Sequence, residues 1–155
     1  MIMSKLQSDD INDYLDKHVP YRVGILLAHF RLVRQGRASS QAILDACFVA
    51  SLVTARMFLN TLGIGKDKTT LVRFRPLDTD VCVDDLGGVL IDPAILPPDE
   101  QDLFFKFLKM ADQAAAHFTI PIVHDWTVTH DVVLRVHKHL KANLYDHVGR
   151  RIEDV

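Results

Sequence analysis

The chain has 155 residues, of which 48% are hydrophobic and 25% charged, and its formal net charge is −2. A chain of this length fits a single domain, and this composition is that of an ordinary globular protein. A net charge near zero gives no electrostatic reason to expect DNA or a membrane surface as a partner. We therefore expect one domain, residues 1–155, with neither kind of partner.

The N-terminal residues and the longest apolar region favour a cytoplasmic location. Residues 1–13 lack the apolar core and small-residue cleavage site of a signal peptide. The longest apolar region, residues 46–59, is shorter than the roughly 20 apolar residues that a membrane span needs. The two cysteines, Cys47 and Cys82, form no metal-binding or redox motif.

Caps, glycine stops and apolar spacing predict five helices. They cover residues 9–18, 20–35, 41–62, 99–118 and 130–148. Ser8 is a good N-cap for the first, Pro20 suits the first position of the second, and Gly36 ends the second. The other signals are Ser39 or Ser40 and Gly63 for the third helix, Pro97 and Pro98 for the fourth, and Thr127 or Thr129 and Gly149 for the fifth.

The apolar residues of the last three predicted helices indicate an all-α bundle of about five helices. The third is apolar almost all round, which predicts a central position. The fourth and fifth each carry one stripe at three-and-four spacing, which predicts a core-facing side. The stripes consist of Leu103, Phe104, Phe107, Met110, Ala111, Ala114 and Phe118 in the fourth, and Val133, Val136, Leu140 and Leu144 in the fifth.

Residues 63–97 show no helical period and are expected to form a long, partly extended excursion. Loops of this length are uncommon inside a compact domain. Within the excursion, the runs VCV and VLI flank DDLGG, which predicts a short β-hairpin. Because an isolated hairpin is marginal in water, it must pack on the bundle or pair with another chain.

Charge is unevenly distributed along the sequence. Residues 19–44 contain four arginines and no acidic residue, whereas residues 76–105 contain eight acidic residues and no basic one. The two segments are expected either to attract each other, within a chain or between two chains, or to be solvated independently. Exposed ion pairs would contribute typically less than about 1 kcal/mol each.

Arg22 and His29 are the candidate catalytic residues. Seven residues correspond to almost two helical turns, so both side chains lie on one flank of the apolar face of the second helix. The pattern Arg22-VGILLA-His29 resembles the HEPN superfamily, small helical bundles that include RNA-cleaving toxins. The resemblance implies metal-independent RNA cleavage, with His29 as general acid or base and Arg22 holding the phosphate. The alternative is an ordinary core helix with two polar edges.

Histidines gather near the C-terminus and suggest a third hypothesis. Two His-Asp pairs, His124-Asp125 and His130-Asp131, resemble those of HD-type metal-dependent phosphohydrolases, in which histidine and aspartate hold a divalent metal. The chelating i, i+4 spacing of histidines is absent. The remaining histidines of this region are His117, His137, His139 and His147.

The leading expectation is a protein without a marked catalytic site that acts as a homo-oligomer, a dimer, or through another protein partner. RNA is a partner only under the ribonuclease alternative. An EF-hand starting at Asp78 is excluded, because Cys82 and Val89 stand where oxygen ligands are needed. No metal and no cofactor are therefore expected.

Overall fold

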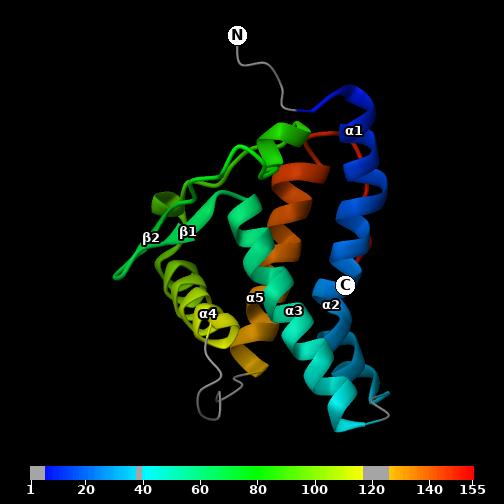
Figure 1. Ribbon diagram of the computed structural model, residues 1–155, viewed down its shortest axis with the longest axis vertical. Helices are drawn as coiled ribbons and strands as arrows, with labels where there is room; N and C mark the ends of the chain where they lie inside the picture. Colours follow the sequence, from blue (N-terminus) through cyan, green and yellow to red (C-terminus); the bar gives the residue numbers. More distant parts are fainter. Residues whose placement is uncertain (1–5, 38–39, 117–125) are drawn as a thin grey trace.

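The computed structural model describes residues 6–37, 40–116 and 126–155, with all their side chains except those of residues 114–116. Among these residues, four long helical stretches surround one continuous hydrophobic core, and a short two-stranded sheet lies at one side (Figure 1). The prediction of a helical fold is confirmed. Five separate helices are not observed, because the first two predicted helices form one stretch.

The first stretch runs from α1 (Ser8–Asp13) through a π-helical turn (Tyr14–His18) into α2 (Val19–Gln35) without a break. Pro20 was expected to start a new helix, since proline lacks the N–H of a regular helical bond. The π turn instead carries the chain into the proline, with the N–H of Val19 bonded to the Tyr14 carbonyl. The predicted end of this helix is confirmed by Gly36, which has a φ of 61°.

The other helices begin close to the predicted positions. α3 (Gln41–Thr61) follows the predicted N-cap Ser40, whose Oγ accepts a hydrogen bond from the N–H of Ile43 at 3.3 Å. α4 (Pro98–Ala116) begins at the predicted proline pair. α5 (Trp126–Leu140) continues into a second π turn (Lys141–Tyr145).

α3 occupies the central position that its composition predicts. It contacts α2, α4 and α5, and α5 lies behind it between the other two (Figure 1). The predicted core-facing stripes of α4 and α5 are confirmed. Buried side chains are Phe104, Phe107 and Ala111 in α4, and Val133, Val136, Leu140 and Leu144 in and after α5. Leu103 and Met110 are half-buried, and the side chains of Ala114 and Phe118 lie outside those described.

The two strands lie earlier in the excursion than predicted. β1 (Ile64–Lys66) pairs antiparallel with β2 (Leu71–Arg73). The Asp67 carboxylate closes their turn by accepting hydrogen bonds from the N–H groups of Thr69 and Thr70, at 2.7 and 2.8 Å. These bonds lower the pKa of Asp67. An aspartate that caps its own turn in this way favours chain reversal.

The prediction of a β-hairpin around DDLGG is wrong. Residues 83–86 form a 3₁₀ turn, and Gly87 ends it with a φ of 91°. The next residue, Gly88, passes so close to the second π turn that a Cβ there would lie 2.4 Å from the Asn143 carbonyl oxygen. Val89 then donates its N–H to that carbonyl at 2.8 Å. The two glycines therefore close a helical turn and allow contact with a distant helix instead of joining two strands.

Arg31 of the basic helix α2 forms an ion pair with an acidic residue near the C-terminus. The Arg31 guanidinium lies 3.1 Å from the Glu153 carboxylate, and residues 150–155 run back along the first helical stretch (Figure 1). Arg150 pairs with Asp16 on that stretch. The acidic partner of Arg31 is therefore the chain end and not the acidic segment 76–105.

Candidate functional site

His29 lies in the interior, where α2, α3 and α5 meet. Its side chain is 0% exposed, and its Nδ1 lies 2.9 Å from Nε2 of His130 on α5. Phe48 and Trp126 contact its ring edge-on, with ring centroids at 5.2 and 4.8 Å. The helices thus hold the imidazole in a largely aromatic cage.

Burial determines the electrostatics of this histidine pair. Desolvation lowers the pKa of His29, and the neighbouring His130 lowers it further, against a smaller opposing effect of Asp45. Desolvation also lowers the pKa of His130, against an opposing effect of Asp131. Both rings are therefore neutral near pH 7, and one donates its N–H to the other. His29 Nε2 and Thr129 Oγ1 are buried without a hydrogen-bond partner among the described residues.

Arg22 lies in a different environment from His29, although both are on the same flank of α2. Arg22 is half-buried and lines a cavity of about 490 Å³ that His29 does not reach. The expectation that the two side chains line one exposed groove is not met in this chain, because α5 and the aromatic rings cover His29. Among the described residues, His29 and Arg22 therefore do not share a groove that could hold a ribose and its phosphate.

The C-terminal histidines that the structure describes do not converge on one point. His130 bonds to His29, the Nε2 of His137 lies 2.7 Å from the Glu153 carbonyl oxygen, and His147 is exposed. His139 lies 2.8 Å from the Glu100 carboxylate. His117 and the pair His124-Asp125 lie outside the described residues. Among the described residues, therefore, these histidines supply no common metal site.

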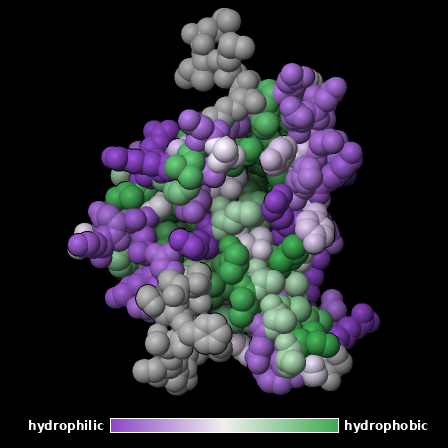
Figure 2. Space-filling model, viewed as in Figure 1, coloured by the Kyte–Doolittle hydropathy of each residue, from purple (hydrophilic) through white to green (hydrophobic). Residues whose placement is uncertain are grey.

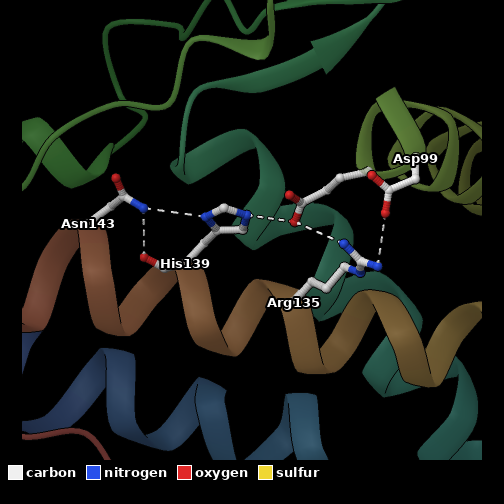
Figure 3. A network of polar contacts seen from close by, with 5 residues as sticks. Asp99, Arg135, His139 and Asn143 are labelled. Carbon is white, nitrogen blue, oxygen red and sulfur yellow. Dashed lines mark hydrogen bonds and ion pairs between the residues drawn. The ribbon is translucent and has the colours of Figure 1, made fainter. Parts of the chain in front are cut away.

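A charged network joins the start of α4 to the end of α5 (Figure 3). Glu100 is only 7% exposed, and it contacts His139 at 2.8 Å and Arg135 at 3.8 Å. The Arg135 guanidinium also lies 3.4 Å from the exposed Asp99 carboxylate. Asn143 donates to the His139 carbonyl at 3.1 Å. The buried carboxylate lies in the first turn of α4, where the helix dipole favours negative charge. We therefore interpret the network as a structural contact that holds the start of α4 against α5.

Cys82, Asp84 and Asp85 place three possible ligand atoms within 4.8 Å of one another. Local structure explains their proximity: Asp85 accepts a hydrogen bond from the Cys82 N–H at 2.9 Å and so caps the 3₁₀ turn. This turn gives no reason to revise the expectation of no metal.

One exposed side of α3 carries a row of apolar residues between positions 42 and 53. Ala42, Ala46, Val49 and Val53 follow one another at spacings of four, three and four residues, which aligns them along one side of a helix. All four are exposed, Val49 to 53% and Val53 to 50%. Hydrophobic atoms gather over this part of α3 in Figure 2. We call these four residues the α3 stripe.

The α3 stripe shows that this central helix, although apolar almost all round, keeps one side exposed. The 4–3–4 spacing was visible in the sequence, but which side faced the core was not. By length and composition alone α3 would also pass as a membrane span, a test that core helices of soluble proteins pass as well. Comparison with protein-family models, curated proteins and solved structures finds no match to this chain.

Proposed function

We propose that this chain is a non-catalytic helical module that associates with a second copy of itself through the α3 stripe. The observation that carries the proposal is the row of exposed small and branched apolar residues on α3. α3 contains only two charged residues: Asp45, which lies beside the stripe near Val49, and Arg56, which follows Val53 by three residues. Exposed apolar surface of this kind marks interaction sites.

The order of side chains along the stripe fits an antiparallel, two-fold arrangement. Two copies of α3 that cross halfway between Ala46 and Val49 place each Ala46 opposite a partner Val49. The same symmetry places Ala42 opposite Val53, so that a large side chain always meets a small one. Alternation of large and small residues lets two helices approach closely, and a two-fold axis makes the contact self-complementary.

Sedimentation velocity at micromolar protein concentration tests this proposal. The wild-type chain is expected to sediment as a dimer, and Val49→Glu as a monomer, because the substitution would bury a charge at the centre of the contact. Ile95→Glu is the matched control: Ile95 is 79% exposed and lies far along the chain from α3, so its variant should remain dimeric. A monomeric wild type, or a dimeric Val49→Glu variant, would contradict the proposal.

Two further readouts separate the alternatives. Flotation of the wild type with liposomes, lost in Val49→Glu, would assign the stripe to a membrane surface instead of a second copy. Incubation with a mixed RNA in the presence of a chelator tests the absence of catalysis. Cleavage by the wild type but not by His29→Gln would overturn the non-catalytic part of the proposal, and intact RNA is the expected result.

A further inference from the structure

A second feature of the molecule has the properties of a small-molecule site. The cavity of about 490 Å³ lies between the first helical stretch, the second half of α3 and residues 79–86. This size is typical of pockets that enclose small organic ligands. Its walls are mainly apolar and include Leu52, Met57, Phe58, Phe74 and Leu86. Leu52, Phe58 and Leu86 belong to the hydrophobic core, so the walls are held in place by the fold.

A few polar side chains converge on this cavity from different elements. Arg22 comes from α2, Arg56 and Asn60 come from α3, and Asp80 comes from the excursion. The Arg56 guanidinium is already paired with the Asp112 carboxylate at 2.8 Å. The Asp80 carboxylate accepts the N–H of Leu77 at 2.8 Å and so has a structural role in its turn.

Arg22 differs from these neighbours. Within residues 6–37, 40–116 and 126–155 its guanidinium forms no ion pair and no hydrogen bond, although the residue is half-buried. A guanidinium carries five N–H donors and one permanent positive charge. Partial burial of such a group without an acceptor is unfavourable, and an oxyanion in the cavity would remove that cost.

The charges and walls of the cavity specify the ligand class. Arg56 is paired with Asp112, and Asp80 keeps its negative charge, so Arg22 is the cavity guanidinium that has no carboxylate partner among the described residues and can accept one negative charge. Carboxylate fits the planar fork of arginine through two parallel hydrogen bonds. The apolar walls match an aliphatic or aromatic body. We propose that this cavity binds a small acid that carries one carboxylate on an apolar body, with Arg22 as the carboxylate-binding residue.

The adjoining basic pocket is a weaker candidate for an anion. It is lined by Arg56, Lys66, Arg73 and Arg75, among other residues. Asp112 already engages two of these cations, at 2.8 Å from Arg56 and 2.8 Å from Lys66. The other two arginines are exposed to solvent. Surface cations of this kind are screened by salt and hold small anions weakly.

Titration calorimetry with decanoate, below the concentration at which it forms micelles, tests the proposal. The wild type is expected to bind decanoate, and Arg22→Gln to bind it at least about tenfold more weakly through loss of a charge-assisted hydrogen bond. Arg22→Lys should restore part of the affinity. Arg34→Gln is the matched control, because Arg34 is exposed on the same helix and does not line the cavity.

Two additional measurements make the test independent of folding. Thr79→Trp adds bulk at an exposed residue of the cavity lining and should block decanoate while circular dichroism stays unchanged. Decanol, which has the same chain but no charge, should show no difference between the wild type and Arg22→Gln. Equal decanoate binding by the wild type and Arg22→Gln, or no binding by the wild type, would overturn the proposal. Arg22 is not part of the α3 stripe, but Val53 belongs to both the stripe and the cavity lining, so sedimentation velocity of each variant is measured alongside calorimetry to show that self-association is unchanged.

Discussion

Two histidines of α5 connect this helix to its neighbours in opposite ways. His130 meets the buried imidazole of His29 on α2, inside a largely aromatic cage. His139, nine residues later, meets the Glu100 carboxylate at the rim between α4 and α5, with Arg135 beside it. The first contact excludes water and charge, whereas the second is a network of charged groups that partly face solvent.

The difference between these two contacts shows how environment determines what a histidine does. Interior burial disfavours the charged imidazole, so the His29–His130 contact depends on neutral rings. At the rim, the Glu100 carboxylate lies 2.8 Å from the His139 ring and also contacts the Arg135 guanidinium, and solvent reaches both partners. Packing should therefore dominate the first contact and electrostatics the second.

The largest effect is expected from His29→Ala. The substitution leaves a cavity in the core and removes the contact with His130, so we expect the free energy of unfolding to fall by about 2–4 kcal/mol. Denaturant unfolding followed by circular dichroism measures the change. His147→Ala removes an exposed imidazole and should cost less than about 0.5 kcal/mol. Similar losses in both variants would refute the proposed packing role of His29.

A smaller loss is expected from Glu100→Ala. This variant leaves His139 and Arg135 without their shared carboxylate, but solvent reaches both partners and Arg135 keeps Asp99, which limits the cost to about 1–2 kcal/mol. The matched control is Asp99→Ala, since Asp99 contacts the same arginine from an exposed position and should cost less than about 0.5 kcal/mol. High salt should reduce the effect of Glu100→Ala but not that of His29→Ala. Equal salt dependence would remove the distinction between the two contacts.

The pH dependence of stability should report on the interior pair. Burial lowers the pKa of both His29 and His130, so the unfolded chain binds protons first as the pH falls below about 6.5. The contribution of the two buried neutral rings to the free energy of unfolding is therefore complete above that pH and is lost as the pH falls. Each histidine can contribute a slope of at most about 1.4 kcal/mol per pH unit.

Unfolding curves between pH 7 and pH 5 measure this slope. His130→Gln should flatten it, because one of the two titrating groups is gone. His147→Gln should leave it unchanged, since that ring is exposed. A slope in His130→Gln equal to that of the wild type would assign the acid sensitivity to other groups.

Much of the helical architecture was predictable because its signals are local. Ser40, Gly36 and the proline pair before α4 act through contacts within one turn of the chain, and the α5 stripe reflects the helical repeat. The continuous passage through Pro20 was missed, because a π turn leaves no simple sequence signal. The hairpin was misplaced because two glycines serve helix ends and close approaches as readily as strand turns.

The sequence by itself determined where most helices begin and end, and which sides of α4 and α5 are apolar, since both depend on residues three or four positions apart. Only the tertiary structure decided what Arg22 and His29 do. Helical pitch places them on one flank, but one faces a cavity and the other meets His130, which is 101 residues away along the chain. Contacts at that separation depend on how whole helices pack, and no local pattern encodes them.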